Sequence, residues 1–293
     1  MAIIDEIKES FKKGSTLTRL IYINLAVFIL VNLVEAIFFL SNNHARFSDF
    51  LVQLAVPADL SLLLKRPWTL VTYMFTHKGF VHILFNLLWL FWFGKVFLEY
   101  FDGKKLVGVY ILGGLSGAFF YILAFNLFPV FNQYLILSIA LGASASVTAI
   151  AIAVASYVPN YTWNLLFIGP VRIIYVAIAV FIISSLIEFS ENTGGKIAHI
   201  GGAIFGYLYT VRYKQGKDMT RGINRFLDKV FDLLRPKPRI RVTHRKSETD
   251  MDYNKRKSDE QKDVDRILDK IAKSGYSSLS AREKEILFRQ SKK

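Results

Sequence analysis

Apolar residues gather in six long runs, at positions 20–40, 80–98, 106–127, 135–158, 173–187 and 197–211. The first run has about 21 residues, enough to cross a hydrocarbon core of about 30 Å as a helix. The last two runs are shorter, but we keep them as spans because a helix surrounded by other helices needs less apolar surface. The pattern therefore predicts an all-α, polytopic membrane protein with six transmembrane helices.

Charge is divided unevenly between this apolar body and a basic tail. The 293 residues are 53% hydrophobic and only 20% charged. Residues 212–293 carry 24 Lys+Arg against 13 Asp+Glu, a net charge of +11, whereas the first 211 residues carry 13 against 10, a net of +3. Such a tail is typical of a segment that faces the anionic cytoplasmic leaflet. We therefore expect the tail to contact the lipid bilayer and not a nucleic acid. The absence of cysteine excludes disulfides and thiolate catalysis.

Lys and Arg in the short loops favour a cytoplasmic location for both termini. Residues 1–19 have mixed charge and resemble neither a cleaved signal peptide nor a mitochondrial presequence. We therefore expect a multi-pass protein of a bacterial plasma (inner) membrane. In this orientation the second, fourth and sixth spans run in the same direction, and their first residues lie at one depth in the outer leaflet.

Four polar residues fall at that depth. Ser144 follows Gly142 early in the fourth span, and His199 lies near the start of the sixth. His82 and Asn86 are four residues apart in the second span, so they face the same way on a helix. An ionisable side chain inside a span is costly and is a candidate functional residue by default. We interpret Ser144 as a nucleophile and His199 as the general base that accepts its proton.

Each of these residues also has another interpretation. A serine after a glycine is often an ordinary helix-interface residue, and His82 and Asn86 can hydrogen-bond to each other. Metal binding by His82 and His199 is a further alternative, with His77 as a third ligand. No Asp or Glu lies at this depth in the three spans, so a third member of a catalytic triad is not evident.

Two pairs of glycines, Gly113 with Gly117 and Gly202 with Gly206, remove side chains once per helical turn. In lipid this spacing lets helices approach closely. The second pair continues the turn spacing from His199, so we expect it to hold the histidine-bearing helix against a neighbour.

The tail divides into three parts. Residues 212–235 predict a basic amphipathic helix that lies on the inner membrane surface, with packing on another protein surface as the alternative. Residues 236–262 are polar and predict a disordered linker. Residues 263–293 predict a small cytoplasmic helical hairpin, in which Gly275 ends the first helix and Ser280 with Glu283 forms a capping box for the second.

Residues 20–211 resemble the rhomboid family of intramembrane serine proteases. The resemblance rests on the order and spacing of four motifs, which are Arg66-Pro67-Trp68, His82-x-x-x-Asn86, Gly142-x-Ser144 and His199-x-x-Gly202-x-x-x-Gly206. It implies a six-helix rhomboid-like bundle in which a Ser144–His199 dyad cleaves single-span or other transmembrane protein substrates. It also implies that His82 and Asn86 stabilise the oxyanion, and that no metal or organic cofactor takes part. The alternative is a catalytically silent relative that binds membrane-protein clients.

The chain departs from the family pattern at two positions beside the serine. Ala145 stands where the family commonly has glycine, and we expect its methyl group to reduce the room at the oxyanion site. Thr148 stands where the family often has an aromatic residue that stacks on the histidine. Because Thr148 cannot stack on the ring of His199, another residue must hold that ring in place.

Overall fold

The computed structural model describes residues 3–165, 168–187, 192–234 and 249–290. The chain divides into two compact units, residues 1–235 and residues 236–293. The first unit contains α1 (Ile3–Lys13), α2 (Thr16–Leu40), α3 (His44–Val52), β1 (Val56–Pro57), α4 (Leu60–Lys65), α5 (Thr69–Thr72), α6 (Phe80–Tyr100), α7 (Gly103–Leu127), η1 (Pro129–Tyr134), β2 (Ile139–Ala140), α8 (Ser144–Tyr157), β3 (Thr162–Leu165), β4 (Gly169–Arg172), α9 (Ile173–Ser185), α10 (Thr193–Lys214) and α11 (Arg221–Leu234).

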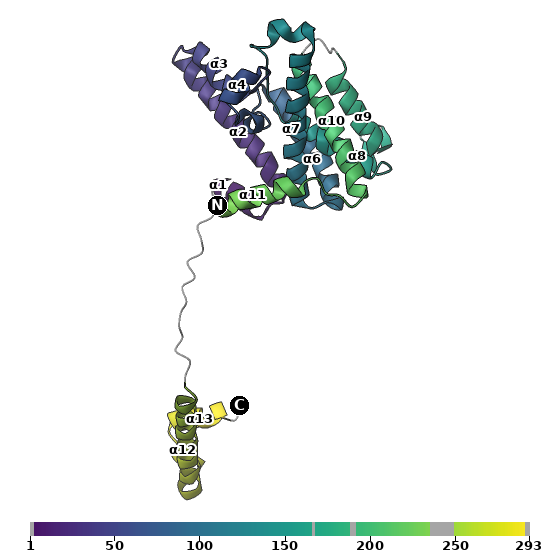
Figure 1. Ribbon diagram of the computed structural model, residues 1–293. Helices are drawn as coiled ribbons and strands as arrows, with labels where there is room; N and C mark the ends of the chain where they lie inside the picture. Colours follow the sequence, from purple (N-terminus) through teal and green to yellow (C-terminus); the bar gives the residue numbers. More distant parts are fainter. Residues whose placement is uncertain (1–2, 166–167, 188–191, 235–248, 291–293) are drawn as a thin grey trace. The chain divides into compact units, whose positions relative to one another are not determined.

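The first unit is a helical membrane bundle, which confirms the predicted fold class (Figure 1). Within the described residues, α2, α6 and α7 are long and apolar enough to cross a membrane, and α8 and α9 are shorter apolar helices. The sixth predicted span corresponds to α10, which has 22 residues and extends beyond its apolar run at both ends.

The fourth span starts later than the hydrophobic pattern predicts. The apolar run begins at 135, but α8 begins only at Ser144. Residues 139–140 instead form β2, which pairs antiparallel with β1 from the long first loop. Gly142 then adopts a φ of +128°, which lies outside the helical region. Apolar composition marks residues that leave water, but it does not tell a buried strand from a helix.

Helices α7, α8 and α10 all pack against one another, and α8 approaches the other two very closely. A Cβ added at Gly113 or Gly117 of α7 would lie 2.3 or 2.5 Å from the Cβ atom of an α8 alanine. A Cβ added at Gly202 or Gly206 of α10 would lie 2.2 or 2.3 Å from an α8 carbonyl oxygen. Both predicted glycine pairs are therefore confirmed as close-packing positions, and both act on α8.

The amphipathic helix forms as α11, but it begins at Arg221, later than predicted, because residues 212–214 continue α10. It packs on α7, where Lys104 Nζ lies 2.8 Å from Asp228. A Cβ added at Gly108 would lie 2.5 Å from the Cβ atom of Thr220, the residue just before α11. The side chains of Phe226 and Phe231 remain exposed. Its location on a membrane surface stays a prediction.

The second unit contains α12 (Asp250–Ser274), η2 (Tyr276–Ser278) and α13 (Ala281–Gln290). Helix α12 already includes residues 250–262, which we had predicted to be part of the disordered linker, so that boundary is corrected. The helix starts there because the Thr249 side chain caps it by accepting from the Asp252 N–H. Residues 236–248 lie outside the described residues. The predicted capping box is confirmed, because the Ser280 N–H donates to Glu283 and the Glu283 N–H donates to Ser280 Oγ.

Candidate active site

Ser144 is the first residue of α8, and the backbone before it is bent so that only glycine fits. Gly142 has a positive φ, and a Cβ there would lie 2.7 Å from Cε1 of the His82 ring. The same added atom would be 3.7 Å from Ser144 Oγ. Gly142 therefore lets the His82 ring and the serine hydroxyl approach the same small space.

Buried hydrogen bonds hold the segment that presents Ser144. The Gly142 N–H donates to the Tyr73 carbonyl oxygen at 2.9 Å, and the Ala143 N–H donates to Nε2 of His77 at 3.2 Å. His77 has no exposed surface, and its Nδ1 lies 3.2 Å from the Phe75 carbonyl oxygen. Burial lowers the pKa of His77 to about 4, so the ring is neutral and Nε2 is available as an acceptor.

His77 is thus a supporting residue whose role the sequence did not reveal, because its partners are main-chain atoms. Its ring also packs edge-on against the ring of His82, with 5.2 Å between the centroids. Both of its nitrogens face hydrogen-bonding partners, which leaves neither free to bind a metal ion. Within the described ranges, no group of three His, Cys, Asp or Glu residues could hold one.

His199 lies on α10, and α9 fixes the direction of its ring. Its Nδ1 is 3.1 Å from the Ser184 carbonyl oxygen and 3.3 Å from the buried hydroxyl of Ser185. A carbonyl oxygen only accepts hydrogen bonds, so Nδ1 carries the proton and donates it. Nε2 is then the unprotonated nitrogen. Orientation by a main-chain carbonyl takes the place of the aromatic ring that Thr148 does not supply.

Lys196 strengthens the same junction one turn earlier on α10. Its side chain is buried and donates to the Ile187 carbonyl oxygen at 2.5 Å, just beyond the end of α9. A cation is favourable at the carbonyl end of a helix, where backbone oxygens lack helical partners. Lys196 and His199 therefore both attach α10 to the C-terminal end of α9 and the residues just after it.

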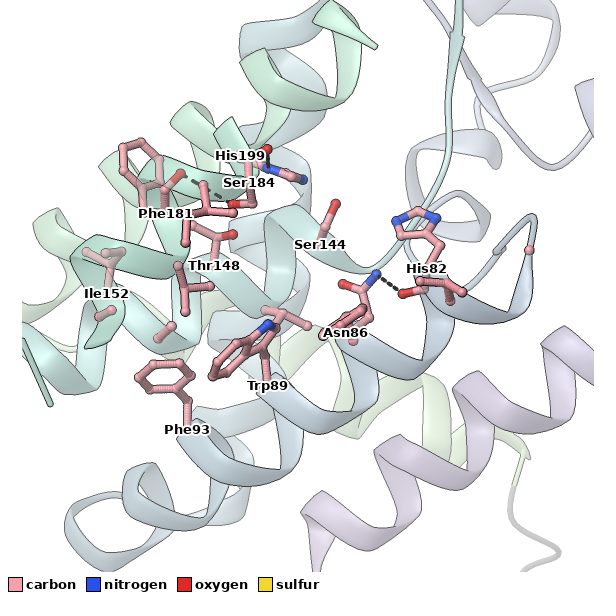
Figure 2. Close-up of a pocket in the computed structure, with 18 of the residues that line it drawn as sticks. His82, Asn86, Trp89, Phe93, Ser144, Thr148, Ile152, Phe181, Ser184 and His199 are labelled. Carbon is pink, nitrogen blue, oxygen red and sulfur yellow. Dashed lines mark hydrogen bonds between the residues drawn. The ribbon is translucent and has the colours of Figure 1, made fainter. Parts of the chain in front are cut away.

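His82 and Asn86 face the same cavity from α6 (Figure 2). The side-chain amide of Asn86 donates to the main-chain carbonyl oxygen of His82 at 2.9 Å. The two residues therefore do hydrogen-bond to each other, as the structural alternative from the sequence predicts, but the acceptor is the His82 main chain and not its ring. The His82 ring faces Gly142, and the second N–H of the Asn86 amide has no acceptor within the part of the chain that the structure describes.

All four predicted site residues line one cavity of about 880 Å³. Figure 2 shows Ser144 between the His199 ring and the His82 ring, with Asn86 beside it. Ser144 and His199 make no direct hydrogen bond to each other in the described part of the chain. Catalytic hydrogen bonds are often loose until a substrate is bound, so this geometry is compatible with a nucleophile and its base.

Ala145 does not crowd the oxyanion site, contrary to our expectation. Its side chain is 1% exposed and does not line the cavity. A Cβ added at Gly117 would lie 2.5 Å from the Cβ atom of Ala145, so the alanine methyl group fills the room that this glycine leaves on α7. The two positions are complementary, and the extra methyl points away from Ser144.

Comparison with known proteins gives relatives of two organelles. The chain is 29% identical over 161 residues to RHOMBOID-like protein 12, mitochondrial, of Arabidopsis thaliana, covering 51% of this chain and 47% of that protein. It is 25% identical over 205 residues to Rhomboid-like protein 16, chloroplastic, of the same plant, covering 66% and 64%. The chain thus spans about half to two-thirds of these relatives' lengths. Their locations conflict with the bacterial membrane that we inferred, and we withdraw that inference.

Two families match parts of the sequence. Residues 247–293, which hold the C-terminal helices, match a family of unknown function, DUF6576. Residues 64–215, more than half of the chain, match the Rhomboid domain. This stretch contains α6 to α10 and all four residues around the cavity. The chain is therefore a membrane protein that belongs to the rhomboid family.

Proposed function

We propose that this protein is an intramembrane serine endopeptidase that cleaves transmembrane protein substrates with a Ser144–His199 dyad. The observation that supports it most is the commitment of His199 Nδ1 to the Ser184 carbonyl oxygen at 3.1 Å. That bond leaves Nε2 as a proton acceptor on the cavity that Ser144 also lines. A serine hydroxyl is a poor nucleophile until a base accepts its proton.

In the first step Ser144 Oγ bonds to the substrate carbonyl carbon while its proton moves to Nε2 of His199. The carbonyl π electrons move to the oxygen, which becomes an oxyanion. When this intermediate collapses, the peptide C–N bond breaks and Nε2 gives its proton to the leaving nitrogen. Water then attacks the acyl-enzyme in the same way, with Nε2 again as base, and restores the Ser144 hydroxyl.

Three donors surround the place where the oxyanion forms. The Ser144 N–H donates no hydrogen bond within the described part of the chain, because it opens a helix. The remaining N–H of Asn86 and the ring of His82 supply the others. Preorganised donors of this kind are worth about 3–4 kcal/mol each.

The substrate must be a polypeptide that already lies in the membrane and can unwind locally. A helix hides its carbonyl groups in its own hydrogen bonds, so an intact transmembrane helix offers Ser144 nothing to attack. Segments with Gly or Pro near the cut bond are the expected substrates. At the opposite end of the bundle, the basic and apolar residues of α11 suit an anionic membrane surface, with both termini on that side.

The test uses the purified full-length protein in detergent with a panel of single-span substrates. We expect cleavage by the wild type and a loss of about 10⁶-fold in Ser144→Ala and in His199→Ala. Ser146→Ala is the matched control, because this second serine of α8 is buried and does not line the cavity. Cleavage at an undiminished rate by Ser144→Ala would exclude the dyad.

A catalytically silent scaffold is the competing function. It predicts that the wild type binds the substrates without cutting any of them, and that Ser144→Ala binds them equally well. A scaffold has no need of a histidine whose Nδ1 is held by a main-chain carbonyl and that lines the same cavity as a serine. Cleavage that depends on both residues would eliminate it.

A further inference from the structure

Residues 73–77 lie inside the bundle between α5 and α6, and we call them the connecting segment. They form turns and extended chain rather than helix, and four of the five residues are at most 2% exposed. Main-chain groups that leave water inside a membrane protein need hydrogen-bond partners from the protein itself. The partners of its carbonyl oxygens therefore show what holds the connecting segment in place.

On one side the connecting segment holds the two residues before the nucleophile. The Tyr73 carbonyl oxygen accepts from the Gly142 N–H at 2.9 Å, and the His77 ring accepts from the Ala143 N–H at 3.2 Å. Ser144 begins α8 directly after these two residues. The position of the connecting segment therefore sets where the backbone of Ser144 stands.

Tyr110 of α7 holds the same segment through its side chain. Its hydroxyl donates to the Met74 carbonyl oxygen at 2.8 Å, and this carbonyl directly follows the one that binds Gly142. The Tyr110 ring is fully buried and packs on the ring of Phe75, with 5.4 Å between the centroids. One turn further along α7, the Gly114 carbonyl oxygen accepts from the Tyr73 hydroxyl at 2.5 Å.

The Tyr110 hydroxyl has one proton and two acceptors. Besides the Met74 carbonyl oxygen, Oδ1 of Asn24 on α2 lies 3.1 Å away. Asn24 and Met74 have no exposed surface, and no other donor reaches either oxygen within the described residues. Loss of the hydroxyl would therefore leave two buried acceptors unpaired, one on α2 and one in the connecting segment.

We propose that Tyr110 is a positioning residue for Ser144, because its hydroxyl fixes the main chain to which Gly142 and Ala143 are hydrogen-bonded. This proposal rests on the proposed protease function. Tyr110 and Met74 are not among the residues that line the cavity, so a substrate bound there does not touch them. A displacement of about 1 Å at a reacting group can lower the rate about 100-fold. Loss of the hydroxyl is therefore expected to lower kcat and to leave KM unchanged.

The experiment compares Tyr110→Phe with Thr210→Val in the full-length protein, with a single-span substrate in detergent. Tyr110→Phe removes the hydroxyl and keeps the ring. Thr210→Val is the matched control, because the buried Thr210 hydroxyl also donates to a main-chain oxygen, that of Ala153, at 2.7 Å. Ala153 lies toward the other end of α8 from Ser144.

We expect Tyr110→Phe to lower kcat by about 10- to 100-fold with an unchanged KM. Thr210→Val should lower the melting temperature but keep kcat, because Ser144 stays in place. Equal falls in kcat for the two variants would overturn the proposal, because any lost buried hydrogen bond would then have the same effect.

A double variant separates the position of the serine from the stability of the fold. Adding Asn24→Leu to Tyr110→Phe replaces one of the two unpaired acceptors by an apolar group. The double variant should therefore melt at a higher temperature than Tyr110→Phe, whereas kcat should stay low, because the Met74 carbonyl is still unpaired. Recovery of kcat together with the melting temperature would overturn the proposal. The double variant also replaces Tyr110→Phe if the single variant does not fold.

Hydrogen–deuterium exchange tests the same link without catalysis. Tyr110→Phe should make the amides of Gly142 and Ala143 exchange several-fold faster, with unchanged exchange later in α8. If the wild type cleaves no substrate, this result supports Tyr110 as the residue that positions Ser144 even though the protease function fails. Unchanged exchange at both amides overturns the proposal, whether or not the protein cleaves.

Discussion

The two faces of α8 differ sharply in how they are packed. One face is in very close contact with α7 and α10, through Ala145 and Ala149 against the four glycines at positions 113, 117, 202 and 206. The other face borders a cavity of about 880 Å³ and carries Ser144, Thr148 and Ile152. The same 14-residue helix is thus buried tightly on one side and left open on the other.

This difference shows how a reactive group can be held still beside an empty space. Helices in lipid gain no hydrophobic energy from meeting each other, so close contact between small residues is what fixes their positions. Contacts on the packed face therefore determine where Ser144 stands, and no contact inside the cavity is needed to place it. A preorganised nucleophile loses less entropy when the substrate arrives.

After the losses expected for Ser144→Ala and His199→Ala, the largest effect among the cavity residues is expected for Asn86→Ala, across the cavity from the open face of α8. Removing one oxyanion donor costs about 10²–10³ in kcat. Asn32→Ala is a matched control, because Asn32 of α2 also donates to the carbonyl oxygen four residues earlier but does not line the cavity. Kinetics with a single-span substrate measure the effect. Equal losses in the two variants would mean that Asn86 acts only through helix structure.

On the packed face of α8, even one added methyl group should lower the stability of the protein. Gly206→Ala places a methyl group 2.3 Å from the Ala149 carbonyl oxygen, so α10 must shift. We expect a stability loss of about 1–3 kcal/mol, seen as a lower melting temperature. Activity should fall with it, because α10 carries His199.

Gly222→Ala supplies the control for this substitution. Gly222 lies in α11, and an added Cβ there meets nothing within 4 Å. Alanine has the higher helix propensity, so this variant should be as stable as the wild type or more stable. An equal loss of stability in both variants would show that the close α8–α10 contact does not matter.

The sequence predicted correctly those helices whose apolar pattern is set by the need to cross a membrane. Long apolar runs specify α2, α6 and α7, since a span must satisfy its backbone internally and face lipid. It failed at residues 135–143, where strand pairing with the first loop replaces the helix. It also failed at residues 250–262, where capping and charge keep a polar helix together without an apolar face.

The candidate site divides in the same way. Motif spacing singled out Ser144, His199, His82 and Asn86, and the structure brings these side chains to one cavity. Their catalytic roles stay predictions. The sequence did not reveal the hydrogen bonds that orient His199 and His77. Their partners are main-chain atoms, which every residue has, so no motif marks them.

A smaller effect is expected for the support of His199. Ser185→Ala removes the hydroxyl that lies 3.3 Å from Nδ1 but leaves the Ser184 carbonyl in place. A net hydrogen bond is worth about 1 kcal/mol, so kcat should fall about fivefold with KM unchanged. Ser185→Thr should restore part of the rate.

Ser184, next to Ser185, tests whether the location of the hydroxyl matters or only the presence of a polar side chain near His199. The Ser184 hydroxyl bonds to the Phe181 carbonyl oxygen at 3.3 Å and lies 3.3 Å from Ser185 Oγ, while its own main-chain oxygen faces His199. Ser184→Ala should therefore leave kcat almost unchanged. A larger loss in Ser184→Ala than in Ser185→Ala would contradict the assigned orientation.

The smallest effect is expected two residues from the nucleophile, at Ser146. Its side chain is 1% exposed, and its hydroxyl has no hydrogen-bond partner within the described residues. An unpaired buried hydroxyl destabilises a fold, so Ser146→Ala should keep full activity and melt at the same temperature or slightly higher. Ser144→Ala should do the reverse, losing activity without losing stability. The comparison of the two faces would fail if Ser146→Ala inactivated the protein, because the packed face would then take part in the chemistry.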